Sequence, residues 1–404
     1  MPVEPSMNPR VIRNILFLLF ALPGVAFASW VSRTPIIRDI LHVSTAEMGI
    51  IIFGLAAGSL VGLLSAGNII SRIGARAVIL VSAILIVIGF VIVGLGTAFS
   101  LTSIVFAGLV IFGGGYGTAE VALNVEGSAV ENQLQKTLLP AFHGSFSMGT
   151  LVGAVIGSGA AALHIPVVVH FGAMAVMIAA VTFYFYRFLP RDTGIEKEVP
   201  TQKVGSNLKV QLAVWKERRI LLIGIIVLGM AFAEGSANDW LPLTMVDGYG
   251  VDSLTGSYMY GLFVAAMTIG RFTGGFILDK YGRVPVLKGS AVLAAIGIIL
   301  VIWGQHYLMA GLGVVLWGFG ASLGFPVGLS AAGDDPRGAA IRVGAVATIG
   351  YIAFLVGPPS LGFLGEHVGL LHALIVVLVG VIVAGLISGA AQPIGMKEKN
   401  QIKI

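Results

Sequence analysis

The chain has no cysteine among its 404 residues. It therefore has no disulfide framework, no thiol nucleophile and no metal site built on cysteine sulfur. Charged residues are also scarce: they make up 11% of the chain, whereas soluble domains contain about 25%. Hydrophobic residues, by contrast, make up 57%. This balance excludes an ordinary soluble protein and indicates a chain that lies mostly inside a lipid bilayer.

Motifs of catalysis and of metal or nucleotide binding are missing as well. The sequence contains no Ser/His/Asp set, no zinc motif and no paired aspartates at catalytic spacing. Its scattered histidines show no metal-ligand spacing, and its 56 glycines form no phosphate-binding loop. We predict that the protein is not an enzyme and that it uses no metal and no cofactor.

Twelve apolar segments of membrane-spanning length account for most of the chain. A bilayer core about 30 Å thick requires roughly 20 apolar residues in a helix. Six such segments precede the polar stretch 190–219 and six follow it. The predicted spans are 15–30, 48–70, 78–98, 101–123, 138–163, 167–189, 220–241, 255–278, 286–303, 307–329, 343–364 and 370–391. The predicted fold class is an all-α integral membrane protein with 12 transmembrane helices.

The positive charges are distributed unevenly between the two sides of the predicted spans. With the N-terminus inside, the even-numbered connections, both tails and the central stretch hold nearly all Lys and Arg, while Arg33 and Arg38 lie opposite. Positive residues concentrate in cytoplasmic loops, so both termini are predicted to be cytoplasmic. The same placement argues against a nucleic-acid partner despite the net charge of +5.

The first span has one alternative interpretation. Basic residues precede it, and Ala26-Phe27-Ala28 resembles a signal-peptide cleavage site. Because cleavage would leave an odd number of spans and reverse the charge pattern, we interpret this segment as an uncleaved first helix.

The two halves of the sequence resemble each other. The segment "GLLSAGNIISRIGAR" ends the second span and "GRFTGGFILDKYGR" ends the eighth, and aligning Gly67 with Gly275 also aligns Gly74 with Gly282. Transporters are often built from such repeats. We expect Gly275 to permit close helix approach. The predicted organisation is an N-terminal six-helix bundle (1–189), a cytoplasmic linker (190–219) and a C-terminal six-helix bundle (220–404).

The Gly-x-x-x-Asp-x-x-Gly-Arg element within 275–283 resembles the signature loop of the major facilitator superfamily. The resemblance covers the whole chain and implies two pseudo-symmetric six-helix bundles around a central cavity, which work by alternating access. It implies a cytoplasmic gating cluster of Asp279, Lys280 and Arg283, which Arg271 reaches by snorkelling. Arg76 is the gating candidate of the first-half copy, where Ser71 stands in place of the aspartate.

Two further elements resemble a narrower group. "GTAEVALNVEG" and "PAFHGSFSMG" resemble fucose-permease-type facilitators, and "AEGSANDWLP" is similar to the YbjJ-like inner-membrane subgroup. The resemblance implies secondary transport in the bacterial inner (plasma) membrane, often with proton symport. Fucose-permease relatives carry an acid late in the first span that helps to couple protons. This sequence has Arg33 near that place, which departs from their coupling scheme and from a neutral-sugar substrate.

Two carboxylates within the predicted spans are the proton-coupling candidates. Glu120 and Asn124 lie on one helix face in the fourth span, and Glu234 and Asn238 have the same spacing in the seventh. An ionisable residue inside a span costs roughly 2.5–3.5 kcal/mol on insertion scales, so it needs a reason. The alternatives are an interhelical hydrogen bond for either glutamate and a cytoplasmic gate for Glu120.

The remaining candidates are assigned to solute binding. A histidine titrates near neutral pH, so His143 either relays protons and reads a hydroxyl or makes an interhelical bond. Trp240 is either an interfacial anchor or a solute platform, and Trp317 either stacks on a solute or packs against the eleventh span. Asp239 belongs to the solute site or to an acidic outer rim. The substrate-binding candidates are Asn124, His143, Asn238, Asp239, Trp240, Arg33 and Trp317.

Three weaker expectations complete the analysis. Arg33 is a candidate to pair with Asp239 or Glu234 as an outer gate. Gly357-Pro358-Pro359 is expected to break or bend the eleventh span, because proline removes a backbone donor. The cytoplasmic turn at Asp334 is assigned no function.

The leading hypothesis is a proton-coupled symporter for a sugar, polyol or amino-cyclitol. Its partners are a small-molecule solute, protons and the lipid bilayer, and the protein is expected to be a monomer. The first alternative is a proton antiporter that exports drugs or metabolites. The second is a non-transporting membrane sensor or scaffold.

Overall fold

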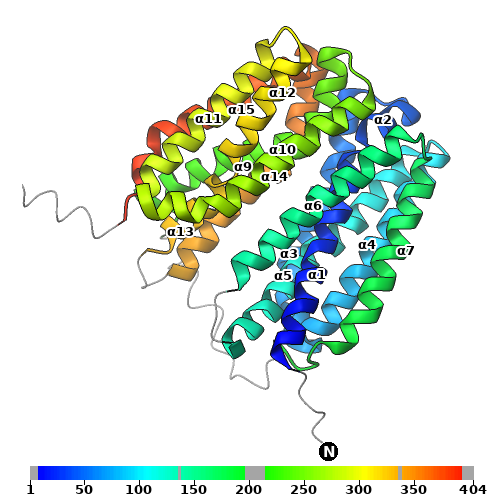
Figure 1. The fold of residues 1–404 in the computed structure, drawn as a ribbon, viewed down its shortest axis with the longest axis vertical. Helices are drawn as coiled ribbons and strands as arrows, with labels where there is room; N and C mark the ends of the chain where they lie inside the picture. Colours follow the sequence, from blue (N-terminus) through cyan, green and yellow to red (C-terminus); the bar gives the residue numbers. More distant parts are fainter. Residues whose placement is uncertain (1–7, 135–137, 196–213, 335–338, 394–404) are drawn as a thin grey trace, which may run out of the picture. The chain divides into compact units, whose positions relative to one another are not determined.

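The computed structural model describes residues 8–134, 138–195, 214–334 and 339–393 (Figure 1). Within these residues, every regular element is helical. The elements are α1 (Pro9–Val31), α2 (Thr34–Leu41), α3 (Thr45–Ile73), α4 (Ala75–Ala98), α5 (Thr102–Leu134), α6 (Leu139–Ala162), α7 (Val167–Phe185), η1 (Tyr186–Phe188), α9 (Arg218–Tyr249), α10 (Ser253–Tyr281), α11 (Arg283–Trp303), α12 (Tyr307–Ala321), α13 (Gly324–Ala332), α14 (Ala339–Val368), α15 (Leu370–Ile387) and η3 (Ser388–Ala391).

The described residues contain 12 helices that are long and apolar enough to cross a membrane. The predicted spans and fold class are therefore confirmed, although several helices extend beyond the apolar segments. The helix α5 runs to Leu134 and α9 runs to Tyr249. The length of an apolar segment predicts only the part of a helix that crosses the hydrocarbon. Polar turns at the helix ends are therefore not predicted from it.

Contacts divide the chain into two units. Unit 1 comprises Met1–Val199 and Asp252–Gly261, and unit 2 comprises Pro200–Val251 and Leu262–Ile404. In unit 1, α3 and α4 pack on α5, α1 packs on α6, and α4 packs on α7 (Figure 1). In unit 2, α9 packs on α14 and α15, and α11 packs on α12 and α15. Of the predicted linker 190–219, residues 196–213 lie outside the described residues.

Glycines bring the backbones of α3 and α5 together. A Cβ atom added to Gly58 would lie 2.1 Å from the Val110 carbonyl oxygen, and one added to Gly117 would lie 2.1 Å from that of Ser59. Small residues permit this approach between membrane helices. The expectation for Gly275 is wrong, because no atom lies within 4 Å of a Cβ built there. The close contacts of the repeated motif are made by glycines other than Gly275.

The two aligned glycines at the ends of the repeat do correspond in structure. Gly74 separates α3 from α4 with φ +82°, and Gly282 separates α10 from α11 with φ +76°. Both ψ angles are extended, at 156° and 170°. This combination is essentially restricted to glycine. The repeat is therefore preserved as the same sharp helix-to-helix connection in both units.

The tenth span is broken, and the eleventh is continuous. The helix α12 ends at Ala321 and α13 begins at Gly324. Pro326 lies four residues after Ser322 and has no N–H to donate to the Ser322 carbonyl, which interrupts the helical ladder. By contrast, α14 continues through Pro358 and Pro359. The expected break of the eleventh span is therefore not found, and a bend there stays a prediction.

Candidate functional site

Asn124 and His143 meet between α5 and α6 in unit 1. The Asn124 side-chain amide donates to the Glu120 carbonyl oxygen at 2.8 Å, and its Oδ1 atom lies 3.1 Å from His143 Nε2. Because an amide oxygen only accepts, Nε2 is the donor in this contact. The His143 ring also packs edge-on against Phe20, with ring centroids 5.8 Å apart. The sequence analysis named both polar residues but did not predict their contact.

Glu234 forms an ion pair with Arg271 inside unit 2. Arg271 Nη2 donates to Glu234 Oε1 at 2.7 Å, which joins α10 to α9. The Glu234 side chain is only 12% exposed and that of Arg271 28%. Opposite charges inside a membrane helix bundle compensate each other, which lowers the cost of holding either one there. The pair explains why both ionisable residues are tolerated in apolar spans.

The ion pair is connected to the break in the tenth span. Arg271 Nε donates to the Ser322 carbonyl oxygen at 3.4 Å. This oxygen is the one that Pro326 leaves without its helical donor. We refer to Glu234, Arg271 and the Ser322 carbonyl as the α9–α10 ion-pair site. Arg271 therefore joins Glu234 of α9 to the residue that follows α12.

This geometry corrects the expectation for Arg271. We expected its side chain to reach the cluster of Asp279 at the end of α10. The two residues are eight positions apart, or about 12 Å along a helix, and the guanidinium of Arg271 has an acidic partner much closer in Glu234. Asp279 and Lys280 are both exposed. Lys280 lies over the Tyr281 ring at 5.1 Å, and Asp279 has no ion pair among the described residues.

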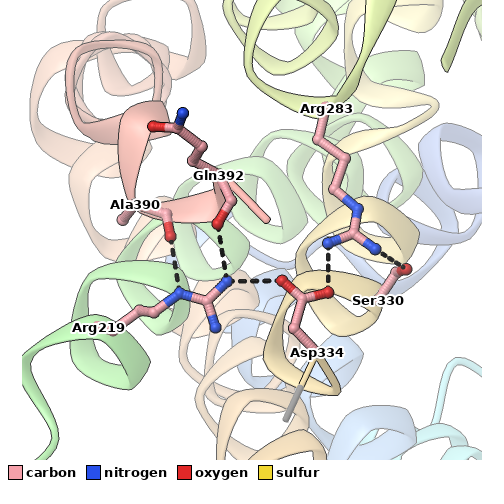
Figure 2. A network of polar contacts seen from close by, with 6 residues as sticks. All are labelled: Arg219, Arg283, Ser330, Asp334, Ala390 and Gln392. Carbon is pink, nitrogen blue, oxygen red and sulfur yellow. Dashed lines mark hydrogen bonds and ion pairs between the residues drawn. The ribbon is translucent and has the colours of Figure 1, made fainter. Parts of the chain in front are cut away.

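Arg283 does enter a charged cluster, but its acidic partner is Asp334 (Figure 2). Arg283 donates to one Asp334 carboxylate oxygen at 2.5 Å and to Ser330 Oγ at 3.2 Å. Arg219 donates to the other Asp334 oxygen at 2.8 Å. The turn at Asp334, to which we assigned no function, thus has a structural role through Asp334, while Asp335 and Pro336 lie outside the described residues. We refer to Arg219, Arg283 and Asp334 as the Asp334 cluster.

The Asp334 cluster joins several helix ends of unit 2. Arg219 also donates to the carbonyl oxygens of Ala390 and Gln392 at 3.2 and 3.1 Å (Figure 2). The cluster therefore connects the starts of α9 and α11 with the second residue after α13 and, through Arg219, with the end of the η3 segment. The three members and these carbonyl acceptors come from four distant parts of the sequence. Two adjacent acids, Asp334 and Asp335, after the predicted tenth span were the signal that could have indicated it.

Arg76 occupies a related place in unit 1. Its Nη1 atom donates to the Leu189 carbonyl oxygen at 3.1 Å, and its guanidinium lies 5.2 Å from the centre of the Tyr186 ring. The N–H of Ala75 donates to the Thr193 carbonyl oxygen at 2.8 Å. These contacts fasten the start of α4 to the segment that follows η1. Its gating role stays a prediction.

The two tryptophans assigned to solute binding are buried inside unit 2. Trp240 is 1% exposed and Trp317 is 0% exposed. The Trp317 ring packs edge-on against Phe263 of α10, with centroids 5.7 Å apart, and its backbone lies against Gly297 of α11. Neither ring is open to a solute in this conformation. At 1% exposure Trp240 does not present its ring to the membrane interface in this conformation, and packing of Trp317 against the eleventh span stays a prediction.

The other candidates have mixed environments. Asn238 and Asp239 are half-buried in the turn of α9 that follows Glu234. Arg33 is 1% exposed, and its Nη2 atom donates to the Ile165 carbonyl oxygen at 2.6 Å. Glu234 takes Arg271 as a partner within its own unit. The outer-gate pairing of Arg33 with Asp239 or Glu234 stays a prediction.

Two acidic residues were missed by the sequence analysis. Glu217 forms a two-point ion pair with Arg342 at 2.8 and 2.9 Å, which joins the start of α9 to α14. Glu126 on α5 is 0% exposed, and neither carboxylate oxygen has a hydrogen bond of ordinary geometry among the described residues, although the Thr193 side chain lies nearby. Glu126 stands within the motif quoted for α5, so an acid inside an apolar run was the available signal.

Comparison with known proteins identifies the family to which this architecture belongs. The family model of the Major Facilitator Superfamily matches residues 15–358. An uncharacterised transporter of Sinorhizobium fredii is 30% identical over 375 residues, covering 90% of this chain and 96% of the relative. An uncharacterised MFS-type transporter of Yersinia pestis is 28% identical over 365 residues, covering 90% of this chain and 91% of the relative.

Solved structures show the same fold at low sequence identity. A mutant form of the nucleoside transporter NupG superposes with a TM-score of 0.77 at 15% identity, covering 94% of this chain and 99% of that one. A D-xylose–proton symporter superposes with a TM-score of 0.72 at 13% identity, covering 94% and 96%. Twelve candidate spans, a repeated helix connection and a matching family model agree. The chain is therefore a membrane transporter that belongs to the Major Facilitator Superfamily.

Proposed function

We propose that this transporter is a proton-coupled symporter for a small polar solute of the sugar, polyol or amino-cyclitol class. It works by alternating access in the bacterial inner membrane, as a monomer with both termini in the cytoplasm. The single observation that carries the proposal is the α9–α10 ion-pair site, where a titratable acid inside the membrane is connected to a broken helix. The similar solved structures include a nucleoside transporter and a D-xylose–proton symporter, which supports a small polar solute.

The proposed coupling follows from the charges of the pair. While Glu234 is ionised, its carboxylate holds Arg271 at 2.7 Å. Protonation removes the negative charge and with it the ion pair, while the Ser322 carbonyl oxygen still accepts from Arg271 Nε. Discontinuous helices often mark the moving or binding parts of transporters. Proton binding at Glu234 is thereby converted into a change at the junction of α12 and α13.

The polar group of unit 1 supplies a second candidate contact for the solute. Glu120, Asn124 and His143 present an acid, an amide and an imidazole from α5 and α6. Such groups read hydroxyl and amino substituents through hydrogen bonds. We propose that Glu120 takes part in proton coupling and that Asn124 and His143 contact the solute. The half-buried Asn238 and Asp239 are the corresponding candidates in unit 2.

Uptake into proteoliposomes tests the proposal. A panel of radiolabelled sugars, polyols and amino-cyclitols is offered with an imposed pH gradient, acidic outside. Symport predicts that one solute accumulates above its external concentration and that a proton ionophore abolishes the accumulation. Accumulation driven by the opposite gradient indicates an antiporter and contradicts the proposal. Facilitated entry without any response to the gradient contradicts the coupling alone.

A further inference from the structure

Arg33 carries a buried charge that the structure does not neutralise. It stands between α1 and α2 and is 1% exposed. The one hydrogen bond of its side chain among the described residues joins Nη2 to the Ile165 carbonyl oxygen at 2.6 Å. Its Nε and Nη1 atoms are also buried, and neither has a hydrogen-bond partner among the described residues. A guanidinium does not lose its proton in proteins, so a buried one requires an anion or further acceptors.

Two other buried polar groups beside Arg33 also lack partners. His170 is 4% exposed and lies within electrostatic reach of Arg33, and neither ring nitrogen has a hydrogen bond to a described residue. It stands one turn into α7, close to the Ile165 carbonyl that Arg33 uses, because its N–H donates to the Pro166 carbonyl oxygen at 3.1 Å. Ser29, one turn before Arg33, is 0% exposed with an unpartnered hydroxyl.

The acids near Arg33 in the sequence have partners of their own. Asp39 pairs with Arg38 at 3.2 Å and is 59% exposed. The Glu47 carboxylate accepts the Ser44 N–H at 2.8 Å in a capping box that opens α3. Neither carboxylate is therefore available to the buried guanidinium. The donors of Arg33, Ser29 and His170 together match a ligand that only accepts hydrogen bonds.

We propose that Arg33, His170 and Ser29 form a binding site for a carboxylate, and that this carboxylate belongs to the transported solute. The second half rests on the proposed transport function. A carboxylate supplies a full negative charge and two accepting oxygens, and charge-assisted hydrogen bonds to guanidinium are the stronger kind. The three groups have no solvent-open surface in this conformation, so the ligand enters in another state of the transport cycle. The solute is then a polar acid, such as a sugar acid.

Binding to the purified full-length protein tests the site directly. The thermal unfolding midpoint is measured against sodium acetate, sodium glucuronate and D-glucose at constant ionic strength, because a ligand of the native state raises the midpoint. We expect a saturable rise with acetate and a larger one with glucuronate, which differs from glucose by its carboxylate. The Arg33→Gln substitution is expected to weaken both apparent affinities about thirtyfold or more.

Matched variants separate the site from general charge effects. Arg38→Gln removes a neighbouring arginine that already pairs with Asp39, so it is expected to leave both affinities unchanged. Arg33→Lys retains the charge and is expected to retain part of the acetate response. An unchanged response in Arg33→Gln overturns the proposal, as does the absence of any carboxylate response in the wild type. A response to chloride alone, measured from a sulfate buffer, assigns the site to an inorganic anion and also overturns it.

A labelling experiment covers the case in which Arg33→Gln does not fold. Because the chain has no cysteine, Ser29→Cys introduces a single thiol one turn from Arg33. Glucuronate is expected to slow its reaction with a charged methanethiosulfonate in membrane vesicles, and an unchanged rate overturns the proposal. Proton-driven uptake of a neutral solute without carboxylate binding overturns this inference and leaves the proposed function standing. Carboxylate binding without proton-driven uptake overturns the proposed function and leaves the carboxylate site standing.

Discussion

The Ser322 carbonyl oxygen accepts a hydrogen bond from Arg271 Nε at 3.4 Å, at the position where Pro326 cannot supply the helical donor. The same guanidinium binds Glu234 at 2.7 Å. A proline that breaks one helix and an acid on another are thus linked through one arginine. The acid that we propose to carry the proton is thereby joined to the junction of α12 and α13.

The Glu234→Gln substitution is expected to abolish the pH dependence of transport. It also removes the carboxylate that Arg271 binds inside the membrane span, so we expect a destabilisation of about 3 kcal/mol. Thermal unfolding in detergent and pH-gradient uptake measure the two effects. The double variant Glu234→Gln/Arg271→Gln is expected to recover stability without recovering coupling. Normal uptake and a normal pH response in the single variant would remove Glu234 from the mechanism.

The Pro326→Ala substitution is expected to restore a backbone donor four residues after Ser322 and to make the tenth span more continuous. The protein should then unfold at an unchanged or higher temperature, because proline in a helix is costly. Transport should slow, because the junction of α12 and α13 loses its freedom. Pro358→Ala in α14, which already continues through its prolines, is the control. Faster transport in Pro326→Ala contradicts a role for the break.

The Asp334→Asn substitution is expected to destabilise unit 2 by about 2 kcal/mol or more, because two arginines lose their charged acceptor. The Asp334 side chain is only 12% exposed. The Asp279→Asn substitution is the matched control for stability, since Asp279 is exposed and has no ion pair among the described residues. We expect it to change stability by less than about 0.5 kcal/mol. Equal unfolding midpoints for the two variants would contradict a stabilising role of Asp334 in unit 2.

Asp279→Asn is still expected to slow transport without weakening solute binding, because the signature loop is assigned to gating. Initial uptake rates and equilibrium binding of the identified solute separate the two quantities. A large loss of affinity would contradict the gating assignment. Since Arg283 binds Asp334 rather than Asp279 in this structure, any slowing by Asp279→Asn arises in a different state of the transport cycle.

Substituting the repeated glycines tests the correspondence of the two units. Gly74→Ala and Gly282→Ala each place a side chain at a positive φ with extended ψ, which costs about 1–3 kcal/mol. A Cβ at residue 74 also lies 2.6 Å from the Arg191 carbonyl oxygen, whereas one at residue 282 meets open space. Thermal unfolding should therefore show the larger loss for Gly74→Ala. The reverse order would contradict the described packing of the 191–195 segment.

The fold could be predicted from the sequence because the membrane imposes a simple requirement on it. Each span must be long and apolar, and this property is readable without knowing any partner. The break of the tenth span was not predicted, although Pro326 was visible. Proline effects depend on whether the freed carbonyl finds another donor, and for Ser322 that donor is Arg271, far away in the sequence.

The candidate site was only partly predictable for the same reason. Helical spacing placed Asn124 within reach of Glu120, because residues four apart share a face. The partners of Glu234 and Arg283 lie on other helices, and no local pattern specifies them. The burial of Trp240 and Trp317 was equally hidden, since an aromatic residue in a membrane helix reads alike whether it faces a cavity, lipid or another helix.

The glycine contacts between α3 and α5 have a mechanical consequence. Where backbones lie so close that a Cβ at Gly58 would reach within 2.1 Å of a carbonyl oxygen, the two helices interlock and resist sliding along each other. Forces applied to α5 are then transmitted to α3 with little internal deformation. We therefore expect α3 and α5 to move as one rigid body, so that flexing during transport occurs in elements that are packed less tightly.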